Sequence, residues 1–427
     1  MIVRRKKNSR HNSARIRLCL CSGPWHLVSL RASILTREKQ QGDNASTYDT
    51  YLIIQGSDWQ KQLREDLLKS AIASQHWREV INIDDALDIT SADQLSKLKH
   101  LLGSLGLPSH VTELWLPHFW PHIPRVAAEV WKTASIYLYE EGLSNYNTFS
   151  VVSYPKYLIG RLRKLAGLLV RGEARATQVL TSLRSTFDRR NVIWSGGAVK
   201  EHIKRTRESY IMLDGFLPLS SNYPDSIDVF PVDRDILHDV LDSYGKYADI
   251  PDIPDIPDIP DIPDITEREG KPKVLFLGQN LSRHSALSSE DELELFRTEV
   301  QSIINAGYQV IWKDHPRAVP PLFDEIKKIS PDDVCILPEL QYCPIEAILP
   351  KLDISFCVGV WSTTLFYAKA IYGIETYTMI NKHKDLIRGN DRLREWLDLT
   401  SRHIPDLDEK LNLADSTGTI GRSQAPS

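Results

Sequence analysis

The sequence predicts an α/β protein with two Rossmann-like domains. Two observations support this prediction. From residue 270 onward, short apolar runs alternate with helical segments, which is the pattern of a doubly wound parallel sheet. A triplet repeat separates this part from an N-terminal part of similar kind, and a length of 427 residues accommodates two domains.

The N-terminal part begins with alternating strand and helix patterns. Its strands are predicted from apolar runs at 16–21, 51–55, 111–115 and 135–139. A turn at Ser22-Gly23-Pro24 precedes a predicted helix at 26–35. A second helix is predicted at 57–70, where apolar residues share one face.

The triplet repeat marks the predicted domain boundary. Residues 249–265 read Asp-Ile-Pro five times and then Asp-Ile. A proline at every third position removes backbone donors and fixes φ, so neither a helix nor an internal strand forms. Polyproline II remains, which makes the segment a semi-rigid acidic spacer. We therefore predict a basic disordered tail at 1–15, an N-terminal domain at 16–245, a linker at 246–268, a C-terminal domain at 269–400 and a C-terminal tail at 401–427.

After the spacer, the alternation of strands and helices is clearer. The strands are predicted at 273–279, 308–313, 334–337 and 354–358. The helices are predicted at 290–306, 320–329, 345–349 and 363–372. The first of these helices has apolar residues at helical spacing, with Gly307 as its C-cap.

The charge is distributed unevenly. The net charge is −4, but the first 17 residues carry seven bases and no acid, whereas the spacer carries six aspartates and no base. The rest of the chain is therefore mildly acidic. This excludes a strongly basic nucleic-acid binder, which needs a surplus of Lys and Arg for its phosphate contacts.

The five cysteines are odd in number and include no CxxC pair, which predicts a reducing compartment and no structural zinc site. The apolar run from Ile16 ends at Ser22-Gly23-Pro24 and is too short for a signal peptide, so we expect a cytoplasmic protein. The basic start could contact an anionic membrane surface. A solvated tail is the alternative.

Two adjacent carboxylates follow the strand predicted at 135–139. Glu140 and Glu141 precede Gly142, which permits a tight turn. Like charges that share a pocket raise at least one pKa, and this suits a general base. An acidic turn in solvent is the alternative.

A second motif follows the strand predicted at 308–313. His315 precedes a proline and lies between Lys313 and Arg317. The restricted geometry before proline could hold the imidazole toward a phosphate. A structural histidine in a turn is the alternative.

Three successive hydroxyl residues, Ser362, Thr363 and Thr364, open the helix predicted at 363–372. Free N–H groups and the helix dipole make such a turn an anion site, although N-capping explains one hydroxyl. Between these two motifs, Glu346 lies near the start of a short helix and could accept hydrogen bonds from ribose hydroxyls. A carboxylate that merely complements the helix dipole is the alternative.

In their order along the chain, these motifs resemble the bacterial sialyltransferases, and most closely the α-2,8-polysialyltransferase-type family. The resemblance includes the strand Leu275-Phe276-Leu277-Gly278-Gln279 and the opening turn Cys21-Ser22-Gly23-Pro24-Trp25-His26-Leu27. It covers most of residues 16–400. It implies a GT-B-like fold, with two Rossmann-type domains that face each other across a cleft, and CMP-sialic acid as donor without a metal or cofactor.

The resemblance also implies roles for the donor-site residues. His315 would bind the donor phosphate and could act as general acid, while Glu346 would bind the cytidine ribose. The hydroxyls of Thr363 and Thr364, with Ser362 nearby, would hold the other phosphate oxygens. Further donor-binding candidates are Lys313, Arg317 and Gly278.

One of the two glutamates, Glu141 or Glu140, would be the base that activates the acceptor hydroxyl, with Glu141 favoured. The sequence departs from the family pattern in having Glu-Glu where Asp is common, and Ser-Thr-Thr where two serines are common. Both changes keep the functional group. The resemblance thus predicts an inverting sialyltransferase or polysialyltransferase.

Several alternatives remain open. The donor could be another CMP-activated sugar, such as Kdo or another nonulosonate. The chain could also be a non-catalytic glycan-binding relative, or an α/β protein whose motifs coincide by chance. The expected partners are a nucleotide sugar and a glycan acceptor of bacterial capsule or lipooligosaccharide synthesis, and no nucleic acid. Peripheral association with the cytoplasmic face of the inner membrane is a further expectation.

Overall fold

The computed structural model shows two compact units, Met1–Val240 and Leu241–Ser427, and the division falls within helix α9 (Arg234–Tyr247). The described residues are 2–4, 15–42, 47–55, 71, 76–83, 100, 102–117, 122–140, 142, 196–217, 226–247, 271–282, 287–316, 318, 322–336, 344–383 and 391–418. The predicted linker at 246–268 lies almost wholly outside them, so the predicted domain boundaries stay a prediction.

The first unit contains an eight-stranded sheet. Its strands are β1 (Ile2–Arg4), β2 (Arg15–Cys21), β3 (Tyr48–Gln55), β4 (Glu79–Ile83), β5 (Glu113–Leu116), β6 (Ser135–Tyr139), β7 (Thr206–Ile211) and β8 (Asp228–Pro231). Their order in the sheet is β1-β4-β3-β2-β5-β6-β7-β8, and only the β1–β4 pair is antiparallel. The run from β4 to β7 has the strand order of a Rossmann fold.

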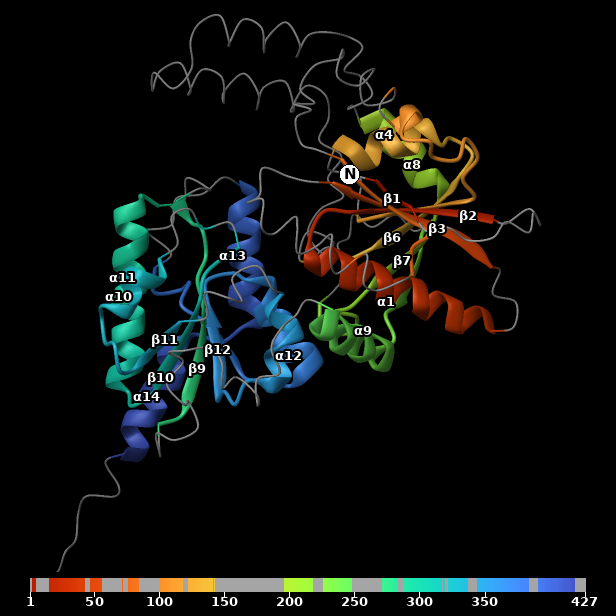
Figure 1. The fold of residues 1–427 in the computed structure, drawn as a ribbon. Coiled ribbons are helices and arrows are strands. Elements are labelled where there is room, and N and C mark those ends of the chain that lie inside the picture. Colours follow the sequence, from red (N-terminus) through yellow and green to blue (C-terminus); the bar gives the residue numbers. More distant parts are fainter. Residues whose placement is uncertain are drawn as a thin grey trace, which may run out of the picture. The chain divides into compact units, whose positions relative to one another are not determined.

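Helices cover both faces of this sheet. The helices α1 (Pro24–Gln41) and α9 lie on one face, and α4 (His122–Val130) and α8 (Gly196–Arg205) lie on the other (Figure 1). Because both faces are covered, the central strands are mostly apolar, and residues 18–21 of β2 are all buried. Helix α1 has Pro24 in its first turn, where the missing N–H costs nothing.

The predicted strands of the N-terminal part are confirmed with small shifts of their ends. Two predictions differ from the structure. The helix predicted at 26–35 extends over 24–41, and part of the predicted disordered tail, Ile2–Arg4, is strand β1 paired with β4. The helix predicted at 57–70 lies outside the described residues.

The second unit contains a five-stranded parallel sheet. Its strands are β9 (Lys273–Leu277), β10 (Gln309–Lys313), β11 (Val334–Ile336), β12 (Phe356–Gly359) and β13 (Thr376–Thr378). Their order is β11-β10-β9-β12-β13, which is again the Rossmann order. The chain therefore has the α/β fold class that the sequence predicts, with a Rossmann-type sheet in each unit.

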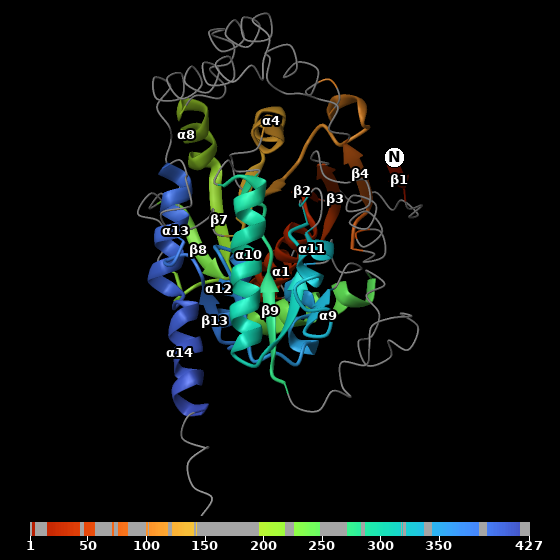
Figure 2. The same cartoon turned by 90° about the vertical axis from the view of Figure 1, so that its left-hand side faces the viewer.

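The helices α10 (Ser289–Asn305) and α11 (Phe323–Lys327) cover one face of the second sheet, and α12 (Thr363–Tyr372) covers the other (Figures 1 and 2). Ser288 caps α10, with its Oγ accepting a hydrogen bond of 3.1 Å from the Asp291 N–H. Helix α12 ends at Gly373, whose φ of 67° is the left-handed conformation typical of a C-terminal glycine.

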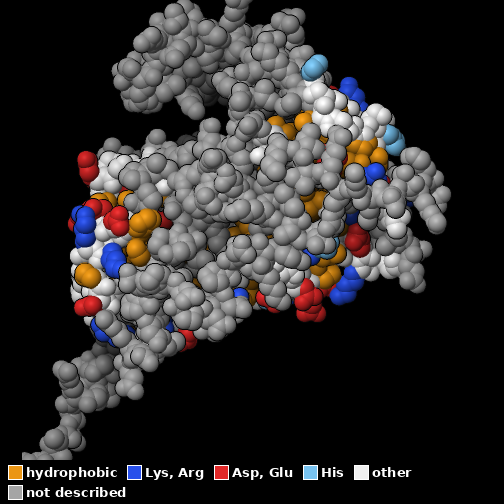
Figure 3. Space-filling model, viewed as in Figure 1, with side chains coloured by type: hydrophobic (Ala, Val, Ile, Leu, Met, Phe, Trp, Pro, Cys, Tyr) orange, Lys and Arg blue, Asp and Glu red, His pale blue; other side chains and the backbone are white. Residues whose placement is uncertain are grey.

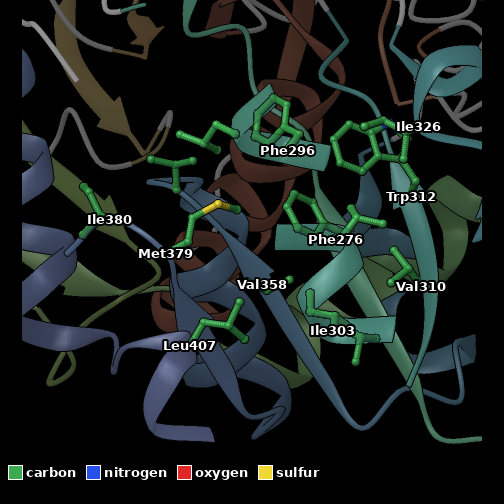
Figure 4. Packing of buried hydrophobic residues seen from close by; sticks show 14 of the residues in the cluster. Phe276, Phe296, Ile303, Val310, Trp312, Ile326, Val358, Met379, Ile380 and Leu407 are labelled. Carbon is green, nitrogen blue, oxygen red and sulfur yellow. The ribbon is translucent and has the colours of Figure 1, made fainter. Parts of the chain in front are cut away.

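Aromatic rings fill the core between the second sheet and α10. The Trp312 ring stacks on Phe276 at a centroid distance of 4.9 Å and meets Phe296 edge-on at 5.3 Å (Figure 4). Such ring pairs stabilise a core beyond the area they bury. Phe276 and Trp312 are the last residues but one of β9 and β10, so their stacking holds these two strand ends together.

Three predictions for the second unit differ from the structure. Residues 401–427 are predicted as a tail, but α13 (Asp391–His403) and α14 (Leu407–Gly418) reach residue 418, and Leu407 and Leu411 pack into the core. The helix predicted at 345–349 is two single turns of 3-10 helix, η6 (Ile345–Ala347) and η7 (Leu349–Lys351). Within the helix predicted at 320–329, the structure describes a helix only over the five residues of α11.

A buried network of ion pairs joins α1 to the first sheet. The Glu113 carboxylate is 2% exposed and accepts hydrogen bonds from Arg17 Nε at 3.0 Å and Arg37 Nη1 at 2.7 Å. The Tyr48 hydroxyl donates to it at 2.6 Å, and Arg37 Nε pairs with Glu208 at 2.9 Å. Burial alone would raise the pKa of Glu113, but the two guanidinium groups lower it.

Acidic and basic side chains are interspersed over the described surface on the face shown in Figure 3. None of the helices in the described part of the chain combines the length and apolar character needed to cross a membrane. The described cysteines, Cys19, Cys21, Cys335 and Cys357, are free thiols. The predictions that the chain is cytoplasmic and binds no nucleic acid stay predictions.

Candidate functional site

The candidate donor site lies where the strand order of the second sheet reverses. Chain order runs outward from β9 in both directions, so the switch point falls between β9 and β12. Ligands of open α/β sheets bind outside the carboxyl ends of the strands at such a point. The motifs with Gly278, His315 and Ser362 directly follow β9, β10 and β12, which are adjacent strands.

The end of β10 carries Lys313, Asp314 and His315. Lys313 is 4% exposed, and its Nζ donates to the backbone oxygen of Asp314 at 3.2 Å. His315 is half-buried, and its backbone oxygen accepts from the Ala318 N–H at 2.8 Å. The strand therefore delivers His315 to the carboxyl edge of the sheet within a tight turn. Arg317 lies outside the described residues.

Asp314 closes the loop that carries His315. Its Oδ2 accepts hydrogen bonds from the Leu322 N–H at 2.9 Å and the Phe323 N–H at 3.0 Å. Burial raises the pKa of this carboxyl group. This role is not recognisable in the sequence, because an aspartate between a lysine and a histidine looks like an ordinary exposed turn residue.

Glu346 and Thr364 form a buried pair. The Thr364 hydroxyl donates to Glu346 Oε1 at 2.7 Å, and these side chains are 7% and 6% exposed respectively. The Tyr372 hydroxyl donates to the Glu346 backbone oxygen at 2.8 Å, which ties η6 to α12. Burial raises the pKa of Glu346, while the Thr364 hydrogen bond and the charge of Lys313 oppose that rise.

Ser362 is the N-cap of α12. Its Oγ accepts a hydrogen bond of 3.3 Å from the Thr364 N–H, and its side chain, like that of Thr363, is half-buried. The positive end of the helix dipole and the N–H groups of the first turn therefore lie next to two hydroxyls. This turn can bind an anion, such as a phosphate. The hydroxyl proton of Thr364 is directed to Glu346 instead.

Gly278 has a packing reason for being glycine. A Cβ at this position would lie 2.8 Å from Cζ2 of Trp312, which is closer than real Cβ contacts. Its N–H donates to the Lys313 backbone oxygen at 2.8 Å, so the pairing of β9 and β10 continues beyond the strand. Its predicted part in donor binding stays a prediction.

Gln279, which the sequence analysis did not single out as a site residue, joins the two sides of the switch point. Its side chain is 7% exposed, and its Oε1 accepts a hydrogen bond of 3.1 Å from the Trp361 N–H. A polar residue directly after a buried strand was the one available signal, and it does not separate a buried amide from an exposed turn.

The first unit carries the acidic pair at the carboxyl end of β6. Glu140 is fully buried; its Oε2 accepts from the Met212 N–H at 2.5 Å, and its backbone oxygen accepts from Ser29 Oγ at 2.5 Å. These bonds tie β6 to the end of β7 and to α1. Gly142 has a φ of 138°, which favours glycine. Glu141 lies outside the described residues.

The opening turn after β2 lies at the same carboxyl edge. The Ser22 Oγ and His26 Nδ1 atoms are 2.7 Å apart, and the His26 ring meets the Tyr139 ring edge-on. The Tyr139 hydroxyl donates to the Leu20 backbone oxygen at 2.6 Å, so β6 and β2 hold each other across β5. Ser22 and His26 thus belong to the same end of the sheet as Glu140.

No group of three or more His, Cys, Asp or Glu residues that could hold a metal ion occurs within the described ranges. The candidate residues therefore form two groups. The group in the second unit comprises Lys313, His315, Glu346 and the start of α12, and the group in the first unit comprises Glu140 and its neighbours. The group in the second unit combines hydrogen-bond donors with the charge of Lys313 and the Glu346 carboxyl group, which accepts from Thr364, whereas the Glu140 side chain accepts from the Met212 N–H.

Comparison with solved structures finds similarity over nearly the whole chain. A UDP-GlcNAc 2-epimerase from Neisseria meningitidis bound to UDP-GlcNAc is 10% identical with a TM-score of 0.46, covering 95% of this chain and 100% of that one. A UDP-GlcNAc 2-epimerase from Methanocaldococcus jannaschii is 11% identical with a TM-score of 0.43, covering 95% and 99%. No curated protein matches the sequence.

A family model described as alpha-2,8-polysialyltransferase (POLYST) matches residues 17–381. The protein is thus a glycosyltransferase with two α/β units. Because the match covers most of its length, the chain belongs to the alpha-2,8-polysialyltransferase family. The match spans both units, so it includes every candidate residue named above.

Proposed function

We propose that this protein transfers sialic acid from CMP-sialic acid to a glycan acceptor, with inversion at the anomeric carbon and without a metal. Membership in the family makes it a sialyltransferase-type enzyme. One observation supports the donor: Lys313 and His315 at the end of β10 and the cap of α12 after β12 lie at the carboxyl edge on either side of β9, and Glu346 is bonded to Thr364 of α12.

The donor half of the proposed reaction depends on charge at the leaving phosphate. Departure of CMP builds negative charge there, and preorganised donors stabilise such charge best. We assign the phosphate to His315, to Thr363 and to the N–H groups at the start of α12. His315 would hydrogen-bond the phosphate and give it a proton as CMP leaves, while Glu346 would hold the ribose hydroxyls.

The acceptor half of the proposed reaction needs a base in the first unit. The Glu140 carboxylate already accepts the Met212 N–H and is fully buried, which favours a structural role for it. We therefore assign the base to Glu141, which would take the proton of the acceptor hydroxyl as that oxygen attacks. Attack opposite the departing phosphate gives inversion through a transition state with oxocarbenium character.

The experiment uses the purified full chain with EDTA and a panel of labelled acceptors. It compares transfer from CMP-Neu5Ac with transfer from CMP-Kdo, and NMR gives the anomeric configuration of the new linkage. We expect transfer from CMP-Neu5Ac, with the configuration opposite to that of the donor. Transfer only from CMP-Kdo, retention of configuration, or loss of transfer on adding EDTA would each contradict a stated part of the proposal.

A further inference from the structure

We propose that Gln279 is a donor-phosphate-binding residue that uses the two ends of its carboxamide for different tasks. Its oxygen fixes the turn before α12, and its nitrogen donates a hydrogen bond to the phosphate of the bound nucleotide. The proposal rests on the proposed function only for the choice of nucleotide, and it adds a residue to that site.

The hydrogen bond to Trp361 fixes which atom of the carboxamide faces the turn. The Trp361 backbone N–H is a donor, so only Oε1 of Gln279 can accept from it, here at 3.1 Å. The Nε2 atom, with two N–H groups, is therefore on the other side of a planar group whose orientation is set. No hydrogen bond joins Nε2 to another residue in the described part of the chain.

The Gln279 carboxamide combines a fixed oxygen with a nitrogen that a ligand can reach. The residue is 7% exposed, yet its Nε2 is not among the buried side-chain atoms of the described residues that lack a partner. Its two N–H groups therefore face solvent and can donate to a ligand that displaces water.

The location indicates the kind of acceptor. Gln279 follows β9 and bonds to the turn after β12, so it bridges the two strands of the switch point. Trp361 directly precedes Ser362, the N-cap of α12, where the helix dipole favours an anion. A neutral amide donor beside the positive end of a helix suits a phosphate oxygen, and it adds no charge that must be neutralised when the site is empty.

A second residue holds the same turn without offering a donor to a ligand. Thr378 of β13 is fully buried; its hydroxyl donates to the Val360 backbone oxygen at 2.7 Å and accepts from the Ile380 N–H at 3.2 Å. The variant Thr378→Val removes support for the turn from the β13 side. It is thus a control for purely structural loosening.

The test measures binding of CMP and of cytidine to the full chain by calorimetry. The variant Gln279→Glu keeps an oxygen for the Trp361 N–H and removes the amide donor. We expect this variant to bind CMP about tenfold or more weakly than the wild type, which corresponds to the loss of one hydrogen bond to a charged group. Its affinity for cytidine should change less than about twofold. Thr378→Val is expected either to lower the affinity for both ligands by the same factor or to leave both affinities unchanged.

The proposal is overturned if Gln279→Glu binds CMP as tightly as the wild type does, or if its affinities for CMP and for cytidine fall by the same factor. A wild type that binds UMP instead of CMP contradicts the proposed function alone. The same comparison with UMP and uridine then supports or overturns the role of Gln279. A wild type that binds no nucleotide overturns both.

Discussion

At the candidate site, side chains of the same chemical type have different contacts, although they look alike in the sequence. Three hydroxyls open α12, yet each is in a different situation. Ser362 caps the helix, Thr364 donates to Glu346, and Thr363 is left half-buried beside the helix terminus. Glu140, after β6, is likewise engaged, because its side chain accepts the Met212 N–H.

Glu346 gives the first prediction at this scale. Burial raises its pKa in the folded chain, so folding stability is full below the usual pKa of Glu and falls as pH rises through the raised value. The variant Glu346→Gln removes this fall and should be at least as stable as the wild type at pH 8. It should also bind CMP about tenfold more weakly, because the carboxylate no longer accepts from the ribose.

Thermal unfolding between pH 4 and pH 8 and calorimetry with CMP check these two expectations. Glu294→Gln, on the exposed side of α10, is the control and should leave CMP binding unchanged. A Glu346→Gln protein that is less stable than the wild type at pH 8 would contradict the expected effect of burial. A variant that binds CMP as well as the wild type does would contradict the role of the carboxylate in ribose binding.

Helix α1 is longer than the sequence predicts, because contacts with distant residues stabilise its last turns. The predicted helix ends at residue 35, but the structure continues it to Gln41. Arg37 in the added turns resembles a solvent-exposed charge in the sequence. Instead it is 7% exposed, because Glu113 and Glu208, far away in the chain, accept its hydrogen bonds.

The same network gives a prediction for the element. Glu113→Gln leaves the guanidinium groups of Arg17 and Arg37 buried without the carboxylate, and breaking such a pair costs about 3–5 kcal/mol. The stability that the Glu113 carboxylate provides is present above the usual pKa of Glu and is lost as pH falls through its lowered value.

Urea unfolding measures this cost. Lys39→Ala is the matched control, because Lys39 lies on the same helix and forms an exposed ion pair with Asp233, so little change is expected. If the two variants unfold at the same urea concentration, the buried network does not stabilise the first unit.

At the scale of the whole molecule, alternating apolar runs were enough to predict a Rossmann-type sheet in each part. The predicted strands followed from their apolar runs, since buried parallel strands are mostly apolar. The strands β1, β4, β7, β8 and β13 were not predicted. The C-terminal helices were missed, because Leu407 and Leu411 stand among charged residues and become core residues only by packing on the second sheet.

The sequence also predicted where several candidate residues lie, at strand and helix ends, while their roles stay predictions. The motifs with His315, Glu346 and Ser362 are recognisable in the sequence because each directly follows a strand or opens a helical turn. Asp314 and Gln279 were not recognised, because their partners come from other segments of the fold. Burial that arises from tertiary contacts leaves no local pattern.

The measurement that tests the central claim most directly is the rate of CMP release from CMP-Neu5Ac by the full chain with EDTA present. It compares the wild type with His315→Ala and Glu141→Gln. We predict release by the wild type, and a rate at least about a hundredfold lower in both variants with an acceptor present, because general acid and base groups contribute typically 10²–10⁴-fold. A wild type that releases no CMP, or two variants that release it at the wild-type rate, would contradict the account.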